Sequence, residues 1–208
     1  MINHVWGLLS RPTQEWRNIR NEGETITHMY AHHVLLMALI PAISAFLGTT
    51  QIGWRVDTEA SRVAVSNGLA MALAFYVLIL VAVGVMGNVI HWMSERFDHR
   101  PSRRRCVLFA GYTATPLFIG GLALLYPSLL LWIVVGMIAV AYTGYLLYTG
   151  YPALLGISLK DGFKEGFTIT GGTLAIGVLV LELLLAATVA LWGLGFDFGV
   201  SWSLFPNR

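Results

Sequence analysis

The chain has 208 residues, of which 56% are hydrophobic and 12% are charged, and its formal net charge is +2. Its mean hydropathy is +0.69. Soluble domains carry about 25% charged residues, so the composition excludes an ordinary soluble protein. The single cysteine, Cys106, excludes an intrachain disulfide, a zinc ribbon and a CxxC redox motif.

Residues 1–33 form the only sizeable polar block before the first apolar segment. Within it, Trp16 and Ile19 recur at helical spacing, and Pro12 suits the first turn of a helix. We predict an amphipathic helix on the membrane surface, with Trp6 and Trp16 at the level of the lipid headgroups. The alternative is a soluble helix that packs against the end of the bundle.

Five apolar segments follow, and one crossing of a bilayer needs about 20 residues. They are residues 34–53, 67–93, 106–126, 128–150 and 171–193. No Asp, Glu, Lys or Arg occurs from Cys106 to Leu159, a run of 54 residues with room for two crossings. The predicted fold is all-α: a polytopic membrane helix bundle with five transmembrane helices and an N-terminal amphipathic surface helix.

This layout divides the chain into a cytoplasmic segment (residues 1–33), a transmembrane domain (34–194) and a short periplasmic tail (195–208). With the N-terminus in the cytoplasm, ten Lys and Arg residues lie in inner connections and three in outer ones. Cytoplasmic loops of membrane proteins carry the excess of basic residues. We therefore expect a multi-pass protein of the bacterial inner membrane with a cytoplasmic N-terminus and a periplasmic C-terminus.

Two features predict a polar pocket near the membrane midplane. Pro116 cannot donate to the carbonyl of Tyr112, four residues earlier, and Thr113 and Thr115 add hydroxyls beside it. Glu182 lies 11 residues after Gly171, about 16 Å along a helix at 1.5 Å per residue. A carboxyl at that depth faces the protein interior by default, so we expect it near this proline kink. It is either a proton or cation site or a structural hydrogen-bond donor.

Histidines lie near the inner ends of the first two segments. His28 and His32 are four residues apart, as are His91 and Glu95. Such spacing places two ligands on one helix face, so a divalent metal site formed by these four residues is one hypothesis. Ordinary interfacial histidines are the alternative, and no cofactor is predicted.

Five arginines gather before the third segment: Arg96, Arg100, Arg103, Arg104 and Arg105. Beside anionic headgroups, each basic residue contributes about 1 kcal/mol of attraction. We expect these side chains to contact the lipid bilayer, and a topology signal alone would also explain them. Nucleic acid is not an expected partner, because no basic groove with interleaved aromatic residues accompanies the cluster.

No catalytic constellation is evident in the sequence. Serine, histidine and acidic residues occur, but none lies in a nucleophile elbow or a phosphate-binding loop. The sequence therefore predicts a protein that is not an enzyme.

The five-segment layout and the motif Gly111-Tyr112-x-x-x-Pro116 resemble the Yip family of membrane proteins. Four further blocks, residues 4–8, 32–37, 48–54 and 173–182, are similar to a bacterial inner-membrane member of that family. The resemblance implies an integral inner-membrane protein whose family has no established catalytic residues. Eukaryotic relatives associate with Rab-type GTPases in vesicle traffic, a partnership that does not carry over to a bacterium.

Two functions follow as hypotheses. The first is a membrane-organising or interaction protein, whose partners are lipids, a second copy of the chain or other membrane proteins. The second is a small cation- or proton-linked transporter or channel that uses Glu182. The first predicts a dry bundle with a basic cytoplasmic face, and the second predicts a hydrated cavity that reaches Glu182.

Overall fold

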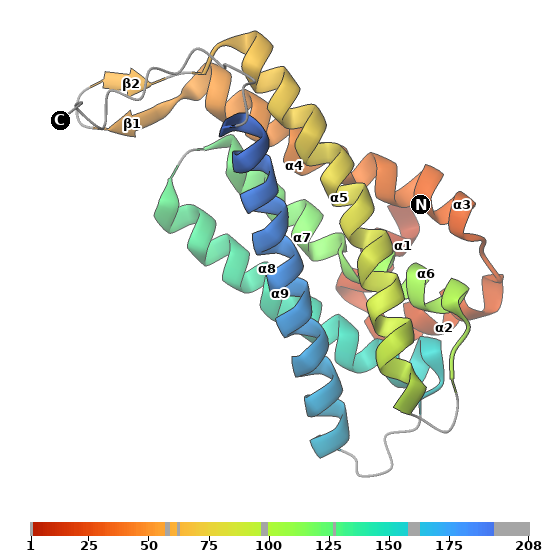
Figure 1. The fold of residues 1–208 in the computed structure, drawn as a ribbon. Helices are drawn as coiled ribbons and strands as arrows, with labels where there is room; N and C mark the ends of the chain where they lie inside the picture. Colours follow the sequence, from red (N-terminus) through yellow and green to blue (C-terminus); the bar gives the residue numbers. More distant parts are fainter. Residues whose placement is uncertain are drawn as a thin grey trace.

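The computed structural model describes residues 2–56, 59–61, 63–96, 100–126, 128–157 and 163–193 (Figure 1). The N-terminal third contains α1 (Ile2–Ser10), α2 (Pro12–Glu22), α3 (Ile26–Met29), the π-helical turn η1 (Tyr30–Val34), α4 (Leu35–Leu47) and a second π-helical turn η2 (Gly48–Ile52). A hairpin of β1 (Trp54–Val56) and β2 (Glu59–Ser61) leads to α5 (Val65–Met93) and the 3-10 turn η3 (Ser94–Arg96). The remainder is α6 (Arg103–Thr113), α7 (Thr115–Gly120), the 3-10 turn η4 (Gly121–Leu125), α8 (Leu129–Gly150), the π-helical turn η5 (Tyr151–Leu155) and α9 (Phe163–Gly193).

Four helical stretches of the described chain are long and apolar enough to cross a membrane: Ile26–Ile52, Val65–Met93, Arg103–Leu125 and Leu129–Leu155. They correspond to the first four predicted segments. The fifth segment coincides with α9, in which Thr168–Leu184 is apolar over a shorter stretch. A fifth crossing therefore stays a prediction, and the predicted tail 195–208 lies outside the described residues.

The first crossing begins eight residues before its predicted start at Val34, because helix continues from Ile26 through the π-helical turn η1. Thr25 caps this helix: its hydroxyl accepts a hydrogen bond from the His28 backbone N–H at 3.2 Å. The early start brings His28, His32 and His33 onto the helix that enters the membrane. Single π-helical turns inside α-helices occur frequently at functional sites.

The third crossing is broken near its middle, as Pro116 requires. Helix α6 ends at Thr113 and α7 begins at Thr115, with Pro116 in the first turn of the new helix, where a missing N–H costs no intrahelical bond. All α6 residues from Cys106 to Thr113 are buried, because α5 packs along one side and α3, η1 and η5 surround the rest. This short helix is the centre of the fold.

The two N-terminal helices pack against the bundle, and α2 contacts α8 and η5. Trp16 is 0% exposed and its ring meets the ring of Phe109 edge to face, with centroids 5.2 Å apart. The expectation that Trp16 contacts lipid headgroups is therefore wrong: Phe109 and its neighbours remove the indole from solvent and lipid. Trp6, by contrast, is 71% exposed. The N-terminal segment thus matches the alternative of a helix packed on the end of the bundle.

The hairpin lies at the opposite end of the bundle from α1–α3 (Figure 1). Its strands are antiparallel, with Trp54 opposite Ser61 and Val56 opposite Glu59. Apart from this short hairpin, the described elements are helical, which agrees with the predicted class.

Candidate functional site: a polar pocket at the N-terminal end

Tyr112 and Glu24 form the link between the centre of the bundle and the N-terminal segment. The Tyr112 hydroxyl donates to Glu24 Oε2 at 2.6 Å, across 88 positions of sequence. Tyr112 is almost completely buried on α6, and Glu24 lies in the connection between α2 and α3. Hydrogen bonds to a charged acceptor contribute about 1.5–3 kcal/mol each. The pair therefore fastens the polar segment to the core.

The carbonyl that Pro116 leaves without a helical donor is satisfied locally. Thr115 Oγ1 donates to the Tyr112 carbonyl at 2.6 Å, and His33 Nε2 lies 3.0 Å from the same hydroxyl oxygen. Because the hydroxyl has one hydrogen and uses it on the carbonyl, His33 must donate to Thr115 through Nε2. The His33 ring also packs on the Tyr112 ring, with centroids 4.6 Å apart.

Three more histidines surround this centre. His28 Nδ1 lies 2.8 Å from Glu24 Oε1, and the His28 and His32 rings stack with centroids 4.2 Å apart. His4 lies between two carboxylates, with Nδ1 2.5 Å from Glu15 and Nε2 3.2 Å from Glu22. These two contacts join His4 of α1 to Glu15 and Glu22 of α2.

These side chains enclose a cavity of about 540 Å³, which we call the N-terminal polar pocket. It is lined by His4, Glu22, Gly23, Glu24, Thr25, His28, His32, His33 and Tyr112. Carboxylates and imidazoles dominate the lining, so the pocket is suited to hold a charged or hydrogen-bonding group.

Of the residues predicted for the midplane pocket, Tyr112 and Thr115 are joined through the Tyr112 carbonyl, and Pro116 is buried beside them. Glu182 does not join them. Its side chain is exposed on α9, and it lines neither the N-terminal polar pocket nor the apolar cavity described below. Tyr112 uses its hydroxyl on Glu24 instead. The expected pairing of Glu182 with the kink is therefore absent from the described residues.

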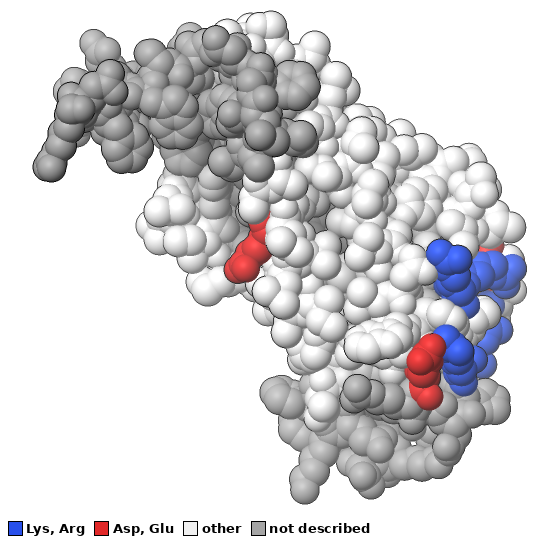
Figure 2. Space-filling model, in the orientation of Figure 1, with Lys and Arg blue, Asp and Glu red and all other residues white. Residues whose placement is uncertain are grey.

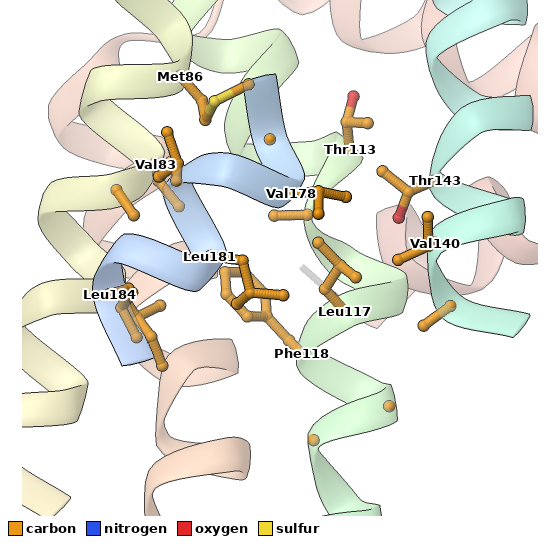
Figure 3. A pocket seen from close by; sticks show the side chains of 18 of the residues that line it. Val83, Met86, Thr113, Leu117, Phe118, Val140, Thr143, Val178, Leu181 and Leu184 are labelled. Carbon is orange, nitrogen blue, oxygen red and sulfur yellow. The ribbon is translucent and has the colours of Figure 1, made fainter. Parts of the chain in front are cut away.

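Thr113 lines a separate, apolar cavity of about 390 Å³ between α5, α6, α7, α8 and α9. Figure 3 shows Val83 and Met86 of α5, Leu117 and Phe118 of α7, Val140 and Thr143 of α8, and Val178, Leu181 and Leu184 of α9 around it. None of the described residues that line it is charged. The described lining of this cavity is therefore mainly apolar.

The four proposed metal ligands lie in two places. His28 and His32 line the N-terminal polar pocket, whereas His91 Nδ1 lies 4.0 Å from Cys106 Sγ, and Glu95 pairs with Arg100 at 2.5 Å. Within the part of the chain that the structure describes, no group of three or more His, Cys, Asp or Glu side chains is arranged to hold a metal ion. The single metal site predicted from these four residues is not formed there.

Arginines just before α6 and in its first turn gather at one end of the molecule (Figure 2). Arg100, Arg103 and Arg104 are exposed and Arg105 is half-buried, while the side chain of Arg96 lies outside the described residues. Arg103 Nε donates to Asn88 Oδ1 at 2.7 Å, which ties the cluster to the end of α5. We call Arg100, Arg103 and Arg104 the exposed arginine cluster.

Sequence reasoning missed His4, Glu15, Glu22, Glu24 and His33 as site residues. Glu15, Glu22 and Glu24 were part of a polar block that seemed only to precede the membrane. One signal was present: Thr25 can cap a helix that starts at Ile26. A helix starting there brings Glu24 and the histidines to the level of α6.

The comparisons with known proteins agree with this architecture. The family described as the Yip1 domain matches residues 6–184. Two relatives, from Escherichia coli strain K12 and Escherichia coli O6:H1, are both called inner membrane protein YohC. Each is 53% identical over 196 residues, which cover 94% of this chain and 98% of the relative. No solved structure shows a significant match. The chain is homologous to these inner membrane proteins, and it belongs to the Yip1 family.

Proposed function

We propose that this protein is a non-enzymatic interaction protein of the inner membrane, whose N-terminal end faces the cytoplasm and contacts anionic lipid headgroups. In this proposal the bundle anchors the chain, and the exposed arginine cluster selects the lipids around its cytoplasmic end. The C-terminus then lies in the periplasm.

One observation carries the proposal: exposed basic side chains gather at one end of the molecule, whereas apolar side chains are exposed along the crossings. The exposed arginine cluster lies at the end where the first and third crossings begin, beside the α1–α2 pair (Figure 2). Many side chains exposed along the crossings are apolar, for example Leu73, Val77 and Val81 on α5 and Ile138 on α8. Such a distribution fits a basic end in the cytoplasmic headgroup layer and apolar sides in hydrocarbon.

Glu182 supports a protein partner in addition to lipids. Its side chain is exposed between Leu181 and Leu183, which are also exposed. Leu181 lines the apolar cavity with Phe118 of α7, so this turn of α9 lies beside the central part of the third crossing. A carboxyl exposed to hydrocarbon is costly. A helix of a second copy or of another membrane protein would supply a hydrogen-bond partner that the described residues do not provide.

The transport alternative has less support. A conduction path needs polar groups that replace hydration, but the cavity nearest Glu182 has no charged residue in its described lining. The geometry therefore favours interaction over transport.

The test compares lipid selection by two variants of the full chain. Purified protein is reconstituted in nanodiscs that contain neutral and anionic phospholipids, and the lipids that stay bound after extraction are weighed by native mass spectrometry. Arg103→Gln with Arg104→Gln should reduce anionic lipid retention, by about fivefold for each arginine if each contributes about 1 kcal/mol. Arg103→Lys with Arg104→Lys keeps the charge and should retain the lipid. Equal retention by the Gln and Lys variants would contradict the proposal.

Orientation is tested separately with terminal fusions in cells. Alkaline phosphatase is active only outside the cytoplasm, so a fusion at the N-terminus should be inactive and one at the C-terminus active. An active N-terminal fusion would overturn the proposed orientation.

A further inference from the structure

The hydrogen bonds inside the N-terminal polar pocket determine what kind of ligand it can accept. Tyr112 donates its only hydroxyl hydrogen to Glu24, and the lone pairs that stay open on this carboxylate are acceptors. His28 donates through Nδ1 to Glu24. The hydroxyl hydrogen of Tyr112 and the Nδ1 hydrogen of His28 are therefore both used on this carboxylate.

Two further imidazoles extend this pattern. His32 Nδ1 lies 3.1 Å from the His28 carbonyl and must donate to it. His33 donates through Nε2 to Thr115, so its Nδ1 is an acceptor too. His33 is 1% exposed and lines the cavity, and its Nδ1 has no hydrogen-bond partner within the described part of the chain. A buried polar atom without a partner needs an explanation, and a group bound in the pocket would provide one for His33 Nδ1.

Charge gives the second requirement. Glu22 and Glu24 line the pocket together with His4, and His4 contacts Glu15 as well as Glu22. An anion would be repelled by this excess of negative charge, whereas a cation would be held. A quaternary ammonium group has no N–H and would leave these acceptors without hydrogen bonds.

From these observations we propose that the N-terminal polar pocket binds a primary ammonium group, with Glu22 and Glu24 as its charged acceptors and His33 Nδ1 as a neutral one. Three N–H donors on one small cation match this set of acceptors. His28 and His32 lie in the first two turns of the Ile26–Ile52 crossing, where headgroups meet water. The same chemistry is available from an ethanolamine lipid headgroup and from a free primary amine.

Ligands of equal charge separate this proposal from simple cation attraction. Ethanolamine and choline both carry one positive charge, but choline has no N–H donor. The purified full chain is titrated with each by isothermal calorimetry in detergent. Binding to phosphatidylethanolamine and to phosphatidylcholine is then compared by native mass spectrometry. In each pair we expect the primary amine to bind at least about tenfold more tightly than the choline form. Hydrogen bonds that involve charged groups are stronger than those between neutral groups.

The two arms also identify the source of the ammonium group. Binding of phosphatidylethanolamine without measurable binding of free ethanolamine assigns the pocket to a lipid. Binding of both shows that the ammonium group alone is sufficient. Equal binding of the ethanolamine and choline forms, or binding of neither primary amine in either arm, would overturn the proposal. Zn²⁺ is titrated in parallel, and binding of Zn²⁺ with no amine binding would overturn it as well.

Substitutions test whether the amine binds in the N-terminal polar pocket. Glu24→Gln keeps the shape of the side chain and removes the charge, and it should weaken amine binding about tenfold or more. Because Glu24 also holds Tyr112, Glu22→Gln is the second variant: the Glu22 side chain is 49% exposed and can change without loss of the fold. The matched control is Glu95→Gln, whose carboxylate pairs with Arg100 outside the pocket. Unchanged amine binding in folded Glu22→Gln and Glu24→Gln proteins would contradict the assignment.

Discussion

The N-terminal polar pocket and the apolar cavity share helix α6 but are built by opposite means. The N-terminal polar pocket is closed by hydrogen bonds between side chains that are far apart in sequence, such as Tyr112 with Glu24 and His33 with Thr115. The apolar cavity is lined by aliphatic side chains, and the buried hydroxyls of Thr113 and Thr143 have no hydrogen-bond partner in the described residues. Polar contacts between distant segments therefore hold the N-terminal polar pocket together, whereas among the threonines of the apolar cavity only Thr173 is hydrogen-bonded within the described residues, to Tyr151 and to the Ile169 carbonyl.

The largest effect on stability is expected when the packing of α2 against the bundle is removed. Trp16→Ala removes a fully buried indole that packs on Phe109 and holds α2 against the bundle. Replacing a buried Trp by Ala typically costs about 3–5 kcal/mol, so we expect a large fall in the thermal unfolding temperature in detergent. Trp6→Ala is the control, because that side chain is 71% exposed and should change the unfolding temperature little. Equal effects of the two substitutions would show that α2 does not pack as described.

A smaller loss of stability is expected when a hydrogen bond beside the N-terminal polar pocket is removed. Thr115→Val keeps the shape of the side chain but leaves the Tyr112 carbonyl and His33 Nε2 without their partner. An unsatisfied buried polar group costs about 1–3 kcal/mol, and chemical unfolding in mixed micelles measures the loss. Thr115→Ser retains the hydroxyl and should restore most of the stability. A Val variant as stable as the wild type would mean that the kink is satisfied in another way.

A Thr→Val substitution in the lining of the apolar cavity should have the smallest effect on stability. Thr143→Val replaces a buried hydroxyl that has no partner in the described residues by a methyl group of similar shape. Removing such a group is neutral or stabilising, so the unfolding free energy should stay the same or rise slightly. The measurement is the same unfolding experiment. A loss as large as that of Thr115→Val would remove the distinction between the two cavities.

The sequence predicted the helical crossings because each is set by local composition. Helix α5 differs from its predicted segment only at the start, Val65 in place of Asn67, and α8 ends at Gly150 as predicted. The break at Pro116 was also predictable, since a missing N–H acts on the carbonyl four residues earlier. These features depend on short stretches of chain and on the thickness of the bilayer.

The polar pocket could not be predicted in the same way, because its contacts join distant segments. Counting residues along straight helices placed Pro116 level with Glu182, and Tyr112 was expected in the same midplane pocket. The helices before Ile26 fold against α6 and bring Glu24 to the Tyr112 hydroxyl instead. The partner of a buried phenol depends on this packing, which neither hydropathy nor spacing contains.

The most direct test measures whether Tyr112 is energetically coupled to Glu24 or to Glu182. Two double-mutant cycles combine Tyr112→Phe with Glu24→Leu and with Glu182→Leu, and unfolding free energies are measured for every variant. Residues in contact show interaction energies of about 0.5–3 kcal/mol, whereas distant ones add within about 0.5 kcal/mol. The account predicts coupling of Tyr112 to Glu24 and additivity with Glu182. Coupling to Glu182 together with additivity for Glu24 would contradict it.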